Sequence, residues 1–441
     1  MDSTDGRGGA DHVRTVSRGR LLRQAALGAS GMALSSSLPA LLSPGAAHAA
    51  ISFTKSSLSV SYWANVTPKQ AFMSVLNGFA KQYGLAVTFN PEPPDYPAFV
   101  QKFTTYLSSG YSGLDAMWID DFSVASWGTA GWLEPLEHRI PRETVAAHLP
   151  VAVKSSTYNG HLYRLSTHLD FVIFFYRKDL FDKEGLSAPR TWNDIVRAGK
   201  RLTKGGRYGI GMAGKSGTTE LFNEIAYYVG QAGADPLHLT TQGARTALKF
   251  MYDLIHTYKV APPDTPAADY SSLLASFMDG RFAMWPVWDG FYGSFQANTR
   301  FWTHSKLAVA LPPRGPVNNS SLFGSWGWAI SKFSKNKDMA AKFIQYAASA
   351  QSEDTLALTG STPGRVSELT NPKVTRVLHQ DPYLALYIKE HIPHPRPLSA
   401  QTQRLSDAIE AAINPYLNNQ ISLDKAVNEA QQKIDQIRRM S

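Results

Sequence analysis

Apolar and polar positions in the first part of the chain follow two periods, one typical of strands and one typical of helices. The pattern predicts strands at residues 58–63, 85–89 and 115–119, and helices at residues 69–83 and 96–108. This βαβαβ order predicts a parallel sheet with helices on its faces. In sheets of this kind, ligands bind beyond the carboxyl ends of the strands.

Polar and aromatic residues follow two of these predicted strands. Trp63 and Asn65 come after the first strand, and Asp120 and Asp121 come after the third. The two carboxylates could instead cap the next helix through its backbone N–H groups. Two interpretations therefore stay open for them, a ligand contact and a helix cap.

Residues 159–181 hold a turn and a strongly apolar run. Asn159-Gly160 is a strong turn signal. Residues 171–176 are aromatic and β-branched, as in a strand that is buried on both faces of a sheet. Asp170 lies at the entrance of this run. Because a buried charge is costly without a partner, we expect Asp170 to contact either an ion-pair partner or a ligand.

The rest of the chain mixes strands and helices and ends in two closing helices. Trp288 follows one predicted strand, Trp326 lies in another that also holds two glycines, and Arg365 ends a loop with Pro and Gly. Strands are predicted at residues 282–287, 306–311 and 323–331, and helices at residues 220–233, 242–258, 271–278, 338–349, 402–417 and 423–439.

Composition excludes several classes of function. The 441 residues include no cysteine, which excludes disulfides, thiolate metal sites, a cysteine nucleophile and a lipid-modified cysteine. The net charge of +9 comes from scattered Lys and Arg residues, a pattern that favours a solvated surface over nucleic-acid binding. No metal-ligand spacing and no phosphate-binding loop occurs, so we expect neither a metal nor a cofactor. His391 and His394, in a proline-rich loop, are interpreted as surface residues.

Residues 1–49 are interpreted as an export signal. A basic segment precedes an apolar stretch at residues 25–42, and Ala47-His48-Ala49 fits a small-x-small cleavage site. A membrane anchor is the alternative, but the apolar stretch is short and broken by serines and a proline. Residues 17–22 resemble a twin-arginine signal with a glycine between the arginines. We expect an exported, soluble chain that begins near Ala50.

Six motifs follow one another in an order that is typical of one family. Residues 115–122 with 130–136 are similar to its D-hydrophobic-D and G-L-x-P-L segments, and residues 159–163 with 175–181 to G-K-L-Y and Y-Y-N-K-D-L-F. The motifs resemble those of extracellular solute-binding proteins of ABC importers, in the group that includes maltose- and other sugar-binding proteins. Arg164 and Arg177 depart from the family pattern. The other matches are residues 189–194 with P-K-T-W-D-E, 277–284 with F-x-x-G-K-A-A-M and 324–331 with G-G-W-G-x-A-I-S.

The resemblance covers about residues 58–440 and implies a periplasmic-binding-protein type II fold: two α/β lobes with a ligand cleft at the hinge. We expect residues 50–168 with 330–370 to form one lobe and residues 169–329 with 371–441 to form the other. The protein would be a periplasmic or extracellular monomer and not an enzyme. It would deliver a carbohydrate, expected to be an oligosaccharide, to the permease subunits of an ABC transporter.

Candidate site residues follow from the chemistry of sugars and from the resemblance. Sugar rings stack on aromatic side chains, and their hydroxyls donate hydrogen bonds to carboxylates. The resemblance implies solute contacts at Asp120, Asp170 and Trp288, with core packing as the alternative for Trp288 and a brace at the hinge as the alternative for Arg365. The expected ligand-binding residues are Trp63, Asn65, Asp120, Asp121, Asp170, Trp288, Trp326 and Arg365.

Two other functions stay open. Paired carboxylates and exposed tryptophans would also serve a secreted glycoside hydrolase, although Asp120 and Asp121 are sequence neighbours whose side chains should diverge. The second alternative is a binding protein for a non-sugar solute, such as a glycerol-phosphate derivative or a polyamine. A phosphate ligand would require a basic cluster in the cleft, for which the sequence offers only Arg365.

Overall fold

The structure is a computed structural model, and it describes residues 57–66, 69–298, 300–301, 306–374, 393–396 and 399–440. Every element described below belongs to one compact unit. The predicted export signal, His391 and the side chain of His394 lie outside what the structure describes. In the described part of the chain, no helix is long and apolar enough to cross a membrane.

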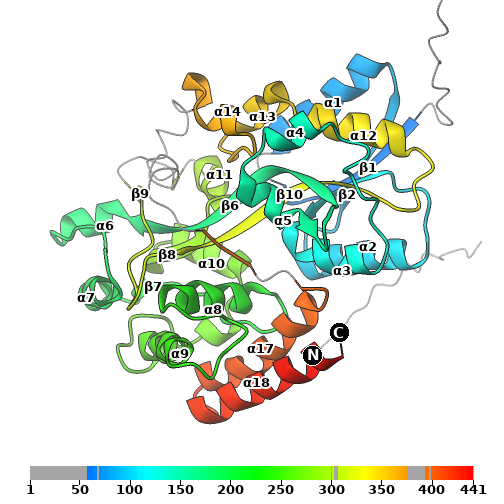
Figure 1. Cartoon of the computed structure of the whole chain (residues 1–441). Helices are drawn as coiled ribbons and strands as arrows, with labels where there is room; N and C mark the ends of the chain where they lie inside the picture. Colours follow the sequence, from blue (N-terminus) through cyan, green and yellow to red (C-terminus); the bar gives the residue numbers. More distant parts are fainter. Residues whose placement is uncertain are drawn as a thin grey trace, which may run out of the picture. The chain divides into compact units, whose positions relative to one another are not determined.

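The first three strands form the parallel sheet that the sequence predicts (Figure 1). β1 (Ser57–Trp63) pairs in parallel with both β2 (Ala86–Glu92) and β3 (Ala116–Asp120). The connecting helices α1 (Lys69–Tyr83) and α2 (Tyr96–Ser108) begin and end at the predicted residues, and their apolar stripes pack into one core with the sheet. The carboxyl ends of β1 and β3 therefore lie at the same edge of the sheet.

Two long strands connect this sheet to the remaining strands. β6 (Arg164–Arg177) and β10 (Ser321–Ile330) lie side by side and antiparallel, and β10 also pairs with β3 (Figure 1). The second half of β6 pairs with β8 (Phe282–Trp288) and β9 (Leu307–Ala310). The full path is β2-β1-β3-β10-β6-β8-β7, with β7 (Tyr208–Ile210) at its end, β9 beside β6, and β11 (Pro393–Pro395) beside β10. The predicted lobe boundaries stay predictions.

The turn before β6 is formed by Asn159 and Gly160, as predicted. Their φ angles are 48° and 82°, both positive, as the central residues of a type I′ hairpin turn require. The turn joins β4 (Thr157–Tyr158) to β5 (His161–Leu162). Asn and Gly are the residues that adopt this conformation at the lowest cost, so the local sequence alone specifies the turn.

The remaining helices pack around three apolar cores. The first is the core of the parallel sheet, the second holds α7 to α9 with the two closing helices, and the third lies against β6 and β8. Six short helices were not predicted from the sequence: α4, α5, α6, α11, α13 and α14. The bounds are α3 (Val124–Thr129), α4 (Arg142–Ala146), α5 (Pro150–Ser155), α6 (Lys178–Lys183), α7 (Trp192–Leu202), α8 (Glu220–Gln231), α9 (Gln242–Ile255), α10 (Tyr270–Met278), α11 (Phe291–Ala297), α12 (Lys337–Ala347), α13 (Ala350–Ala357), α14 (Val366–Leu369), α17 (Thr402–Leu417) and α18 (Leu423–Arg439).

Candidate functional site

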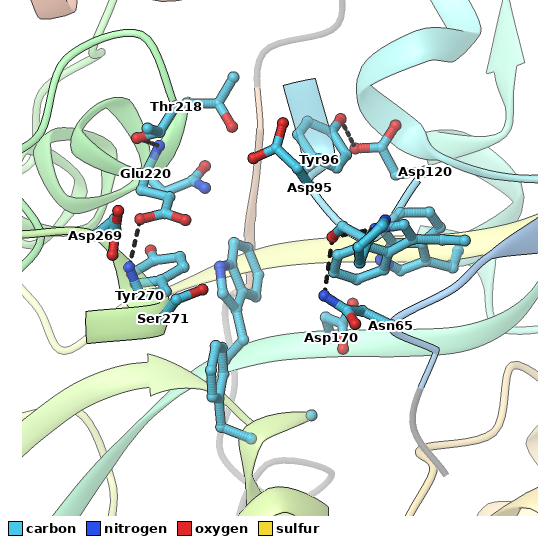
Figure 2. A pocket seen from close by; sticks show the side chains of 18 of the residues that line it. Asn65, Asp95, Tyr96, Asp120, Asp170, Thr218, Glu220, Asp269, Tyr270 and Ser271 are labelled. Atoms are coloured by element: carbon cyan, nitrogen blue, oxygen red, sulfur yellow. Dashed lines mark hydrogen bonds between the residues drawn. The ribbon is translucent and has the colours of Figure 1, made fainter. Parts of the chain in front are cut away.

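A cavity of about 450 Å³ lies where the strand ends of β1, β3 and β8 meet the first turns of α2, α8 and α10. Its size falls within the range of about 300–1,000 Å³ that is usual for small-molecule sites. In Figure 2, Tyr96 and Asp120 lie on one side of the cavity, and Glu220 and Asp269 lie on the other. Six of the eight residues expected from the sequence line it: Trp63, Asn65, Asp120, Asp170, Trp288 and Trp326.

Three tryptophans form a stack in the wall of the cavity. The ring of Trp326 lies parallel to that of Trp63, with centroids 5.3 Å apart, and is stacked 4.7 Å from that of Trp118. Trp326 is only 9% exposed, whereas Trp63 is half-buried. The Trp63 indole N–H donates to the Pro94 carbonyl at 2.9 Å, which fixes the orientation of the ring. Trp63 is therefore the member of the stack with ring surface left for a ligand.

Asp120 both caps a turn and lines the cavity, so the two interpretations of its role are compatible. Its Oδ1 accepts hydrogen bonds from the backbone N–H and hydroxyl of Ser123, at 3.3 and 3.2 Å. Its Oδ2 accepts a 2.5 Å hydrogen bond from the Tyr96 hydroxyl. Burial raises the pKa of Asp120, while Arg396 and the Tyr96 hydrogen bond act in the opposite direction.

Asp121 does not line the cavity, unlike its neighbour. Its side chain is fully buried and accepts a 3.1 Å hydrogen bond from the backbone N–H of Ser325. The same carboxylate forms an ion pair with Arg396, whose guanidinium also reaches Asp120 at 3.5 Å. The expectation of a ligand contact is replaced by a structural role for Asp121, because its oxygens are taken up inside the protein.

Arg396 is a cavity residue that the sequence did not reveal. It follows β11, lines the cavity, and lies with its guanidinium 4.7 Å from the ring centre of Phe122 and 5.5 Å from that of Trp288. Burial lowers the pKa of Arg396, but the Asp121 and Asp120 carboxylates raise it by more than burial lowers it, so the net shift is upward. Arg396 is thus a permanent cation that neutralises the buried carboxylates.

Arg365 lies outside the cavity. Its backbone N–H donates to Glu353 at 2.8 Å, and its guanidinium donates to the Ala348 carbonyl at 3.0 Å. His148 contacts the other oxygen of the same buried Glu353 at 3.0 Å. Arg365 is thus held between α13 and the loop that follows it, and the predicted brace at the hinge stays a prediction.

Asp170 belongs to a buried cluster of titratable groups on β6 and β8. Its Oδ1 lies 2.7 Å from His168 Nε2, and the other ring nitrogen of His168 contacts the Ser361 hydroxyl. Burial would raise the pKa of Asp170, but the His168 charge outweighs this effect and lowers it; the same pair raises the pKa of His168. Burial and the Asp170 charge raise the pKa of Asp289 to about 7. Asp289 accepts from Phe171 N–H and from the Thr362 hydroxyl.

The raised pKa of Asp289 predicts how stability changes with pH. Between the unfolded value near 4 and about 7, the folded protein holds a proton that the unfolded chain releases, so stability falls as pH rises through this window. Asparagine mimics the protonated carboxyl. We expect Asp289→Asn to gain up to about 4 kcal/mol over the parent protein between about pH 4 and pH 8.

This gain is measured by urea unfolding of both proteins across the pH range. The exposed Asp279→Asn variant is the control, since it removes a carboxylate that is accessible to solvent. A difference between Asp289→Asn and the parent protein that does not change with pH would contradict the assignment.

The opposite side of the cavity is acidic, and the sequence did not reveal it either. Glu220 begins α8 and accepts a 2.6 Å hydrogen bond from the backbone N–H of Tyr270. Thr219, which precedes α8, has a φ of 66°, a left-handed conformation that is unusual for threonine. Burial, together with the Asp269 and Glu410 carboxylates, raises the pKa of Glu220 to about 8. In the described ranges, no three His, Asp or Glu residues are arranged to hold a metal ion.

The family model for bacterial extracellular solute-binding proteins matches residues 63–354, which is more than half of the chain. The chain belongs to this family. The match begins at Trp63, the last residue of β1, and includes the long strands β6 and β10 and most of the cavity wall. The resemblance inferred from the six motifs is thereby confirmed.

Curated relatives of this solute-binding protein are similar over part of their length. A mannitol-binding protein of Pseudomonas aeruginosa is 30% identical over 264 residues, which cover 56% of this chain and 59% of the relative. A probable amino-acid ABC transporter periplasmic-binding protein of Sinorhizobium fredii is 25% identical over 267 residues, covering 58% and 60%. The chain thus spans less than two thirds of the length of these relatives.

Solved structures share the fold of this solute-binding protein. Maltose-bound MalE3 of T. maritima superposes with a TM-score of 0.79 at 24% identity, covering 86% of this chain and 99% of that one. A mannitol-bound solute-binding protein of Agrobacterium vitis gives a TM-score of 0.71 at 23% identity, covering 87% and 98%. The periplasmic-binding-protein type II fold expected from the sequence is confirmed.

Proposed function

We propose that this solute-binding protein is the receptor of an ABC importer and that it captures a carbohydrate or a related polyol. The observation that supports the proposal best is the cavity itself, in which stacked indoles face carboxylates. Such a site offers a flat apolar surface to a ring or carbon chain and hydrogen-bond acceptors to its hydroxyls. The names of its relatives include binding proteins for mannitol, for erythritol and L-threitol, and for maltodextrin.

The proposed mechanism is closure around the solute. β6 and β10 would act as the crossing strands, because they pair with each other while β10 also pairs with β3 and β6 also pairs with β8. A solute that bridges the two sides favours the closed form. Shifting such an equilibrium from 1:99 to 99:1 takes about 5.5 kcal/mol of differential binding. An oligosaccharide, which contacts more of the cavity, would supply this more easily than a single ring.

The proposal places the protein outside the cytoplasmic membrane as a monomer, where it hands the solute to permease subunits. It also assigns binding without turnover. A glycosidase needs two carboxyl groups that flank one bond. Of the neighbouring pair, only Asp120 lines the cavity, whereas Asp121 is buried against Arg396. The neighbouring pair is thus ruled out as a catalytic pair, and the family match supports a receptor over a hydrolase.

A thermal-shift screen over sugars and polyols tests the proposal. Ligand at about 100 times its dissociation constant should add about 2.7 kcal/mol to the free energy of unfolding. The best solute should also change the tryptophan emission and reduce the dimensions measured by solution scattering. The proposal fails if no sugar or polyol changes any of the three, or if an oligosaccharide is cleaved during incubation.

A further inference from the structure

The acidic side of the cavity is formed by residues at the first turns of α8 and α10. Thr218, Glu220 and Asp269 lie together on this side (Figure 2), and Lys215 lines the cavity beside them. Lys215 is already engaged, since its ammonium forms a 2.8 Å ion pair with Asp269. Among the described residues, the carboxyl group of Glu220 forms no ion pair of this kind; it accepts a hydrogen bond from the Tyr270 N–H.

Asn223, one turn further along α8, adds an independent observation. It lines the cavity and is only 5% exposed, yet its side-chain oxygen has no hydrogen-bond partner. A buried acceptor without a donor is costly, and such groups in folded proteins are usually satisfied by water or by a ligand. The wall thus combines an unsatisfied neutral acceptor, Asn223, with the carboxyl group of Glu220, which becomes a charged acceptor when it loses its proton.

The cations near the cavity cannot supply that donor. Arg396 is bound to Asp121 and Asp120, and His168 is bound to Asp170 and Ser361. An ammonium group carries three donors and no acceptor, so it matches a wall of acceptors better than a hydroxyl, which brings lone pairs as well. Phosphate and carboxylate groups would instead meet like charge.

We propose that this wall binds a protonated amine, so that the preferred solute is an amino sugar or amino polyol rather than its neutral parent. The inference rests on the proposed function, because the ring or carbon chain of the solute would lie against Trp63. The ammonium would lie between Glu220 and Asn223, with the Thr218 hydroxyl at the edge of the same wall. This assigns a substrate class to the cavity.

The charges around Glu220 make binding sensitive to protons. Asp269 faces it from α10, Glu410 from α17 and Lys215 from the preceding loop, while Glu224 lies one turn along α8. Since burial and these carboxylates raise its pKa to about 8, Glu220 is mostly uncharged in the empty cavity near neutral pH. An ammonium beside it stabilises the carboxylate and therefore expels the proton.

Matched sets of solutes test the inference by calorimetry at about pH 7. Each set holds an amine, its neutral parent and its N-acetyl derivative. The amines are glucosamine, galactosamine and mannosamine, and their parents are glucose, galactose and mannose. The best amine is expected to bind at least about tenfold more tightly than its parent and its N-acetyl form. In buffers of different ionisation enthalpy, binding of the amine should release nearly one proton, and binding of the parent should release none.

Glu220→Gln provides the matched variant. It keeps the acceptor for Tyr270 N–H but removes the charge, so the amine should bind no more tightly than the parent sugar and should release no proton. Circular dichroism and the thermal unfolding midpoint, measured beside the parent protein, show whether the variant is folded. The control is Glu143→Gln, which removes an exposed carboxylate of α4 and should leave the preference intact.

The outcomes separate the inference from the proposed function. Equal binding of amine, parent and N-acetyl forms, or a preference that persists in Glu220→Gln, overturns the inference and leaves the proposed function standing. If no sugar of any kind binds, the inference and the proposed function are both overturned, and binding of a polyamine would not change this result.

Discussion

Arg396→Leu is expected to lower the free energy of unfolding by about 3–5 kcal/mol, because it leaves two buried carboxylates without their cation. Arg396 itself is 8% exposed, and Asp121, its closest partner, is fully buried. Removing one partner of a buried pair exposes the other to the full desolvation penalty. The pKa of Asp120 would rise further, so the deficit should grow as pH rises above the range in which an ordinary carboxyl group titrates.

Urea unfolding at several pH values measures this loss. Arg439→Leu, at an exposed position of α18, is the control and should change stability by less than about 0.5 kcal/mol. Adding Asp121→Asn to Arg396→Leu should restore part of the loss, since it removes one of the stranded charges. A deficit of less than about 1 kcal/mol, or no recovery in the double variant, would show that Arg396 is not the counter-ion of this cluster.

Trp63→Ala is expected to have the largest effect on solute binding, about 2 kcal/mol, which corresponds to roughly a thirtyfold weaker affinity. Trp63 is the half-buried member of the tryptophan stack, so its ring offers surface to a solute. Because it is less buried than Trp326, its removal should change stability less than Trp326→Ala. Affinity is measured by calorimetry with the solute that gives the largest thermal shift.

Trp132→Ala is the matched control for this variant. Trp132 is also half-buried and packs against the same apolar core, but it does not line the cavity. It should lose stability without losing affinity. If Trp63→Ala binds the solute as well as the parent protein does, the tryptophan stack serves packing alone and the proposed binding surface lies elsewhere.

The sequence predicted the parts of the fold that local patterns specify. α1, α2, α17 and α18 have the predicted bounds, because each combines a regular apolar stripe with a clear start or end. The strand ends that carry Trp63 and Asp120 were found for the same reason, since a parallel sheet brings them to one edge. The Asn159-Gly160 turn likewise depends on two adjacent residues only.

The parts of the site that were missed depend on contacts between distant residues. Arg396 is separated from Asp121 by 275 positions, and no local pattern marks it as a cavity residue. The local sequence around Glu220 is that of an ordinary acidic residue in the first turn of a helix. The charges that raise its pKa belong to Asp269 and Glu410, which are distant in the sequence. Conversely, Asp121 and Arg365 were predicted as ligand contacts by residue type and position, but Asp121 is fully buried and Arg365 donates to the Ala348 carbonyl, and neither lines the cavity.

The position of β10 between β3 and β6 also restricts how such a gene can be divided. β10 lies about 200 residues after β3 in the sequence, yet it pairs directly with β3. A fragment that ends before β10 would leave β3 with an open edge and an incomplete core, which favours misassembly. A single recombination event therefore cannot exchange one side of the cavity as an independent module. New specificities are expected to arise by substitutions within the shared frame.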